Sequence, residues 1–390
     1  MNLAPRHLRA AYRSGALNPS DVAAHVLSRL GDADQQLRLL SGLSVYSHHI
    51  VDVEATLEFA LRSEGIAQRT GDPADAAMAD SMLGAAYCLR CDQRRAQDHL
   101  ERSLRSLPRL RGFNESQYLF DMRTFSLSVL THSFFLSGDL DQAVGCAARN
   151  IEEAERSGHP MGLCRSLINP MGLYFWIDDM EQVERNLAKL ERTAERHSLA
   201  PALAVALGLR GRCLIRDGRA MEGMQYLRDS LEKQTVQRYE ILLTDFVFDL
   251  ALGLAKTDAR AGALALVDWW IPAQAGKPHR LPLLFLAKGL AFATGDVPEI
   301  PSAETWFEKA MTQARLESAL PFELRAALEL ARVWIDRGEA RRAHDLVGSV
   351  YDRFSEGVTT PDLVLAKKML APTEAIAKNA AERRSRSGRR

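Results

Sequence analysis

Two cysteines stand where paired thiols could do chemistry. Cys88 and Cys91 have the CxxC spacing, at which two thiolates can bind zinc or form a redox couple. A structural zinc site needs about four ligands, and no second CxxC or CxxH lies in register nearby. A thioredoxin-like couple needs a βαβ context, which the sequence lacks. We therefore expect Cys88 to pack between helices and Cys91 to lie near a turn, and the other cysteines (Cys146, Cys164 and Cys213) to fill core positions.

Other residues that could do chemistry are not arranged for it. His48 and His49 are adjacent, and neighbouring positions on a helix point in different directions, which suits metal chelation poorly. The "GKP" at Gly276 lacks the upstream glycine of a phosphate loop, and the sequence contains no HExxH, GxSxG or SxxK motif. We expect no catalytic residue, no cofactor and no bound metal.

Composition is that of an ordinary soluble protein. The 390 residues include 50 basic and 50 acidic side chains, so no global field favours nucleic acid or an acidic membrane surface. Five cysteines, an odd number at scattered positions, argue against a secreted disulfide framework. We see no apolar run of signal-peptide or membrane-spanning length. The expectation is a cytoplasmic protein that contacts neither membrane nor nucleic acid.

The sequence pattern predicts that helices position the residues named above. Apolar positions recur at three and four residues, and glycines suited to helix C-caps break the pattern at Gly71, Gly138, Gly158, Gly218 and Gly338. The stretch "MLGAAYCLRCDQRRAQDHLERSLRSLP" has the spacing of a tetratricopeptide repeat. Its matching positions are Leu83, Gly84, Tyr87, Ala96, Leu100 and Pro108.

Each predicted repeat is a hairpin of two helices. A small or apolar residue near the start of the second helix recurs with a period near 40 residues. These markers are Ala55, Ala96, Ala143, Val183, Gly223, Ala263 and Ala343, with one unit hidden near Ala303 by a proline-bearing insertion. The pattern predicts an all-α, tetratricopeptide-like solenoid of about eight helical hairpins. We expect each hairpin to contact only its neighbours, as in other solenoids.

The chain divides into three segments by pattern. Residues 1–34 are expected to form an N-terminal helical hairpin, residues 35–372 the solenoid, and residues 373–390 a basic disordered tail ending in "AERRSRSGRR". The N-terminal "LRAAYRSGALNPSDVAAHVLSRL" resembles, weakly, the opening helices of amidase-signature enzymes. The Gly/Ser-rich segment and the lysine of those enzymes are absent, so the resemblance implies no amidase activity.

The solenoid resembles the C-terminal repeat arm of bacterial STAND-class signal-transduction ATPases, of the winged-helix regulator or adenylate-cyclase type. The similar segments are "LFDMRTFSLSVLTHSFFLSGDLDQAV", "AERSGHPMGLCRSL", "LRGRCLIRDGRAMEGMQYLRDSL" and "FELRAALELARVWIDRGEARRAHDLVGSVYDRFSEGVTTPDLVLAKKML". The winged helix, phosphate loop and cyclase domain of such proteins have no counterpart here. What the resemblance implies is an arm that senses a ligand or binds a partner.

A concave face lined by the first helices is the expected binding surface. Positions one turn apart on those helices are His132, Phe135, Phe175, Trp176, Arg212, Arg216 and Arg332. Aromatic and arginine side chains are enriched at interaction hot spots, although the aromatics could equally fill the core and the arginines could be solvated. The expected function is a non-catalytic sensing or protein-binding arm that takes a protein or small ligand. The alternative is an accessory or scaffold subunit of an enzyme with an amidase-like partner.

Overall fold

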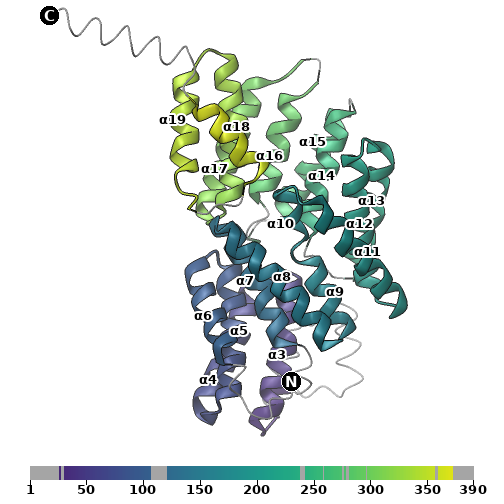
Figure 1. The fold of residues 1–390 in the computed structure, drawn as a ribbon, viewed down its shortest axis with the longest axis vertical. Coiled ribbons are helices and arrows are strands. Elements are labelled where there is room, and N and C mark those ends of the chain that lie inside the picture. The colour runs from purple at the N-terminus through teal and green to yellow at the C-terminus, as the bar shows by residue number, and fades with distance from the viewer. Residues whose placement is uncertain are drawn as a thin grey trace, which may run out of the picture.

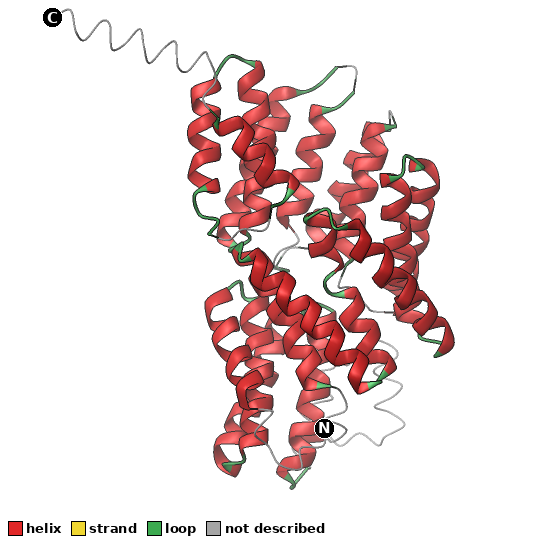
Figure 2. Cartoon of the chain, viewed as in Figure 1, coloured by secondary structure: helices red, strands yellow, loops and turns green. Residues whose placement is uncertain are grey.

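The computed structural model describes residues 26–27, 30–106, 121–237, 242–257, 259–274, 276–277, 281–295, 297–355 and 359–371. These residues form α-helices joined by short turns and contain no β-strand (Figure 2). Most of the predicted N-terminal hairpin, the whole basic tail and Pro108 of the repeat motif lie outside the described residues. The predicted boundaries at residues 34 and 372 therefore stay predictions.

Within the described residues, the helices form eight successive antiparallel pairs, followed by a last helix. The pairs are α3 (Ala33–His49) with α4 (Val53–Thr70), α5 (Pro73–Leu89) with α6 (Gln93–Ser106), α7 (Met122–Ser137) with α8 (Leu140–Ser157), α9 (Pro160–Ile168) and α10 (Met171–Trp176) with α11 (Met180–Arg196), α12 (Ala200–Arg216) with α13 (Ala220–Gln237), α14 (Leu243–Lys256) with α15 (Arg260–Ala273), α16 (Leu281–Ala293) with α17 (Ile300–Leu316), and α18 (Leu320–Asp336) with α19 (Ala340–Tyr351). Helix α20 (Pro361–Leu370) packs on the final pair. The predicted all-α, tetratricopeptide-like solenoid is confirmed.

The small residues used to find the repeat lie where the two helices of a pair approach most closely. Each of the eight markers, including Ala303 of the hidden unit, lies near the start of the second helix of its pair and is buried. Gly84 shows why small residues are needed there. A Cβ atom placed on Gly84 would lie 2.4 Å from Cγ of Leu100 on the partner helix, so any larger residue would push α5 and α6 apart.

The turns repeat with a period half that of the pairs. Many helices are followed by a residue with a left-handed backbone conformation. In three parts of the chain, such residues recur every 20 residues. These residues are Val51, Gly71 and Cys91, then Gly138, Gly158, Asp178, Ser198 and Gly218, then Ser318 and Gly338. The five glycines expected at helix C-caps all have this conformation, which glycine adopts without steric cost. Cys91 therefore occupies a position where other turns of this chain place glycine.

The first helix of the fourth pair is broken in two. Pro170 separates α9 from α10 because proline has no backbone N–H to donate and its ring clashes with the preceding turn. The chain resumes at once, since the N–H of Tyr174 donates to the carbonyl oxygen of Pro170 at 2.9 Å. This break turns α10, with Phe175 and Trp176, away from the line of α9.

First helices contact one another in order from α3 to α18 and form the inner row of the array. The array also closes on itself. The end of α7 reaches the start of α18, and a Cβ atom on Gly138 would lie 2.7 Å from Cδ2 of Leu320 (Figure 1). The expectation that each hairpin contacts only its neighbours is therefore wrong at this point. The cause is the superhelical curvature, which brings the third pair against the eighth.

Candidate functional site

Two of the residues predicted to line a groove form the closing contact instead. Phe135 on α7 and Trp176 on α10 pack with Phe322 on α18, with ring centres 5.2–6.0 Å apart. The guanidinium of Arg325, also on α18, stacks on Trp176 with its carbon 3.5 Å from the ring centre and pairs with Asp362 at 2.9 Å. Three pairs of the array thus meet through aromatic side chains. Of these rings, Phe135 and Phe322 are buried, so the set is a packing contact rather than an open surface.

Phe175 and Arg212 extend this packed region along the inner row. The Arg212 guanidinium stacks on Phe175 at 4.2 Å from the ring centre and forms an ion pair with Asp249 on α14 at 2.6 Å. Burial raises the pKa of Asp249 to about 6, although the positive charge of Arg212 acts in the opposite direction. Desolvation is therefore the larger effect. The arrangement joins α10, α12 and α14 by side chains that neutralise one another.

The other predicted groove residues lie at the edge of this cluster or away from it. Arg216 pairs with Asp178 in the turn before α11, and Arg332 pairs with Glu329 one turn earlier on α18, at 3.0 Å. His132 is exposed on α7, with its ring centre 6.4 Å from that of Phe135. The structure thus brings together Phe135, Phe175, Trp176 and Arg212. It places His132 beside Phe135 at the exposed edge of this set and leaves Arg216 and Arg332 at separate positions.

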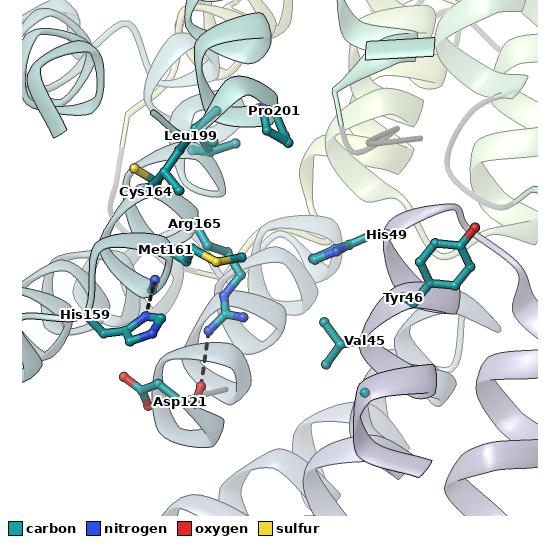
Figure 3. A pocket seen from close by; sticks show the side chains of 14 residues that line it. Val45, Tyr46, His49, Asp121, His159, Met161, Cys164, Arg165, Leu199 and Pro201 are labelled. Carbon is teal, nitrogen blue, oxygen red and sulfur yellow. Dashed lines mark hydrogen bonds between the residues drawn. The ribbon is translucent and has the colours of Figure 1, made fainter. Parts of the chain in front are cut away.

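An open pocket lies elsewhere on the inner row, where α3 faces the starts of α7, α9 and α12 (Figure 3). Its volume is about 320 Å³, at the lower end of the range for small-ligand sites. Most of its wall is apolar. The lining residues are Gly42, Val45, Tyr46 and His49 of α3, Asp121 before α7, His159, Met161, Gly162, Cys164, Arg165 and Ile168 at α9, and Leu199, Pro201 and Ala202 at the start of α12.

Helix periodicity explains which side chains line the pocket. Positions 42, 45, 46 and 49 lie on one face of α3, and 161, 165 and 168 lie on one face of α9. Capping fixes where the opposing helices begin. The carboxylate of Asp121 accepts from the N–H of Thr124 at 3.0 Å, and Nδ1 of His159 accepts from the N–H of Gly162 at 3.2 Å.

Arg165 is a buried, positively charged side chain in the pocket wall, beside Asp121. Its Nη2 donates to the backbone oxygen of Asp121 at 3.1 Å and to Oγ1 of Thr124 at 3.0 Å. Its guanidinium carbon lies 5.4 Å from the centre of the Phe125 ring. Figure 3 shows the side chain between His159 and His49, directed towards Asp121. These contacts hold a buried positive charge in one orientation beside an apolar surface.

The titratable groups around Arg165 are poorly suited to catalysis. Burial lowers the pKa of His49 to about 3, and the charges of His48 and Arg165 act in the same direction, so this imidazole is neutral at physiological pH. Burial also raises the pKa of the Cys164 thiol to about 11. A thiol held protonated is a weak nucleophile. The pocket therefore has the chemistry of a binding site.

The CxxC pair behaves as buried or half-buried thiols. Cys88 lies in the core of α5 and Cys91 in the turn that follows, and burial raises the pKa of each to about 12. Zinc and redox chemistry both need thiolates, which such pKa values disfavour. Within the described ranges, no cluster of three or more His, Cys, Asp or Glu side chains is placed to hold a metal ion. None of the helices described has the length and hydrophobicity to cross a membrane.

The sequence alone does not predict this pocket. His49 stands out only as the neighbour of His48, and Arg165 belongs to no chemical motif. A local signal was present, because "SGHP" marks the start of α9 and places His159 and Met161 at its first turn. What the sequence does not contain is the approach of α3 to α9 and α12, which are far apart along the chain.

Comparison with known proteins finds similarity in fold but not in sequence. No protein-family model matches it, and no curated protein matches it by sequence. Among solved structures, the apo form of the quorum sensor NprR from B. thuringiensis matches with a TM-score of 0.52 and 15% identity, over 85% of this chain and 91% of that one. A Rap protein complexed with Competence and Sporulation Factor matches with a TM-score of 0.55 and 14% identity, over 91% and 89%. At these identities the likeness shows a shared helical-repeat fold.

A STAND protein with a tetratricopeptide repeat sensor from Pyrococcus horikoshii also matches, at 13% identity. Its TM-score is 0.47, and the match covers 90% of this chain and 51% of that one. A score at this level supports no structural argument. The resemblance to STAND repeat arms therefore stays a prediction, as does the resemblance to amidase-signature enzymes.

Proposed function

We propose that this chain is a non-catalytic helical-repeat protein that binds a peptide segment in the pocket between α3, α9 and α12. The observation that carries this proposal is an apolar cavity of about 320 Å³ on the inner row of the array, with one fixed guanidinium in its wall. Solenoids commonly bind extended ligands on such inner surfaces. In this reading the protein serves as a cytoplasmic sensing arm of a bacterial signal-transduction or transcription regulator.

Two observations favour a peptide as the ligand: the lining of the pocket and the shared fold. Met161 is 64% exposed at the pocket, and Val45, Leu199 and Pro201 provide further apolar surface for side chains. Flexible methionine and apolar side chains adapt to ligands of varied shape. The fold is shared with a protein named as a quorum sensor and with one solved as a complex with a factor. Both descriptions agree with ligand binding by an array of this kind.

The test is affinity selection with a soluble mixture of random peptides, followed by identification of the retained peptides by mass spectrometry. We expect retention by the wild-type chain and loss of most retained peptides in Met161→Glu, because a charge at the pocket opposes burial of apolar groups. Met221→Glu is the matched control, since Met221 is 68% exposed on α13 and does not line the pocket. Equal retention by both variants would exclude this pocket as the binding site.

A further inference from the structure

The pocket is also electrostatically uneven, because Arg165 and the starts of three helices lie on one wall, together with one carboxylate, that of Asp121. Helices α7, α9 and α12 all begin at this wall, and each contributes residues of its first turn or cap to the lining. The first-turn N–H groups of a helix carry a partial positive charge that favours anions. Side chains cap the starts of α7 and α9. No side chain caps α12, although its first turn offers few N–H donors, because the N–H of Ala200 donates to the carbonyl oxygen of Ser198 and Pro201 has none.

Arg165 adds a full positive charge to the same wall. Because its Nη2 is fixed by Asp121 and Thr124 and its face by Phe125, the guanidinium keeps a defined orientation. A guanidinium matches a carboxylate in geometry and binds it by charge-assisted hydrogen bonds.

The described polar and titratable side chains at this wall come from three parts of the chain. Helix α3 provides Tyr46 and His49, with His48 beside them. Asp121 precedes α7, and α9 provides Arg165 with His159 at its cap. The carboxylate of Asp121 is engaged with the N–H of Thr124 at the start of its own helix. Burial is the main cause of the low pKa of His49, and the charges of His48 and Arg165 act in the same direction.

We infer that the pocket binds the C-terminus of its peptide ligand, with the terminal carboxylate at Arg165 and the last apolar side chain against Val45, Leu199 and Pro201. The inference rests on the proposed function and specifies which part of a peptide is bound. A chain end suits the site because terminal carboxylates are commonly recognised by backbone N–H groups together with a basic side chain. The volume of about 320 Å³ limits the ligand to a short terminal segment.

The experiment compares N-acetyl-leucyl-leucine, which has a free carboxylate, with its C-terminal amide on the full chain at neutral pH. The two probes differ only in the terminal charge. We expect the acid to bind about tenfold more tightly or better, since a charge-assisted contact is lost in the amide. Bound acid should also raise the pKa of His49, followed by NMR of labelled histidine and assigned with His49→Gln, because a nearby negative charge favours the imidazolium.

Hexanoate tests whether any small carboxylic acid binds the pocket, and Arg165 variants test whether this side chain binds the carboxylate. Hexanoate should bind much more weakly than the dipeptide acid; equal binding would identify a small carboxylic acid as the ligand and overturn the inference. Arg165→Lys keeps the positive charge but removes the planar set of guanidinium N–H donors. This variant should therefore lose most of the preference for the acid over the amide. If Arg165 variants do not fold, the comparison on the wild-type chain still decides the matter.

The two proposals fail in different ways. If random peptides are retained and Met161→Glu releases them, but the acid does not bind or binds no better than the amide, the C-terminal inference is overturned and the peptide pocket stands. If no random peptide is retained and neither dipeptide binds, the proposed function fails, and the inference fails with it.

Discussion

Phe135 on α7 and Phe322 on α18 belong to the third and eighth helical pairs, yet their ring centres lie 6.0 Å apart at an interplanar angle of 71°. Both side chains are buried, and Trp176 of the fourth pair lies beside them. An open solenoid has no such contact, because its pairs touch only their neighbours. The contact makes the third and eighth pairs depend on each other.

Removal of the Phe322 ring should open the array. Phe322→Ala deletes the aromatic side chain shared by Phe135 and Trp176, and we expect a loss of about 3–5 kcal/mol together with a larger radius of gyration in small-angle X-ray scattering. Phe307→Ala is the control, because Phe307 is buried against Gly289 within a single pair and should lose stability without a change in overall size. Equal dimensions in both variants would show that the closing contact does not hold the array shut.

Replacement of Cys91 by glycine should stabilise the chain. Cys91 has a φ of 64°, a left-handed conformation that disfavours a side chain but not glycine. We expect Cys91→Gly to gain about 0.5–1 kcal/mol, measured as a higher urea midpoint. Cys91→Ala removes the thiol but keeps the side-chain strain, so it should not show the gain. A gain of the same size in both variants would attribute the effect to the thiol instead.

Two glycines within helices should respond in opposite directions to alanine. Gly84→Ala places a Cβ atom 2.4 Å from Leu100 and should destabilise the chain by about 1–3 kcal/mol through overpacking. Gly145 on α8 has nothing within 4 Å of such an atom, so Gly145→Ala should stabilise its helix by up to about 1 kcal/mol. Thermal and urea unfolding of the two variants measure both effects. A gain at Gly84 would contradict the close approach of α5 and α6.

We expect ionisation of Asp249 to lower the free energy of unfolding as the pH rises from 4 to 6. Its pKa is raised from 3.8 to about 6 in the folded chain, so the native state holds a proton that the unfolded state has already released. Stability contributed by the neutral carboxyl is present below pH 4 and is lost towards pH 6. The stability of the wild type relative to Asp249→Asn should therefore decrease over this window, by urea unfolding at several pH values.

The control for this prediction is Asp345→Asn, since the Asp345 side chain is 70% exposed. The two variants are measured together between pH 4 and pH 6. If the pH dependence of Asp249→Asn does not exceed that of Asp345→Asn, Asp249 titrates at its ordinary value in the folded chain.

The fold could be predicted from the sequence because its signals are local. A small residue at the start of each second helix and a glycine at a helix end are required within one hairpin, so each repeat carries its own evidence. Ala303 illustrates this, since the spacing predicted a unit that the proline-bearing insertion concealed. The left-handed backbone of Cys91, Asp178 and Ser198 was not predicted, because these residues do not carry the glycine signal.

The candidate site could not be predicted in the same way. Periodicity identified Phe135, Trp176 and Arg212 as inward-facing residues, but it cannot tell a side chain that fills a closed interior from one that lines a cavity. That difference depends on the curvature accumulated over several pairs and on the break at Pro170. His49 and Arg165 form one pocket only because the first and fourth pairs approach each other in space.

The closing contact also fixes the number of units between the third and eighth pairs. Repeat proteins with open ends can gain or lose a unit by duplication or deletion and remain folded, since each interface is local. Here, removal of one unit of about 40 residues between α7 and α18 would displace Leu320 and Phe322 by one step of the superhelix, away from Gly138 and Phe135. Evolution by unit duplication is therefore constrained between the third and eighth pairs. Changes in length are tolerated more readily outside that span.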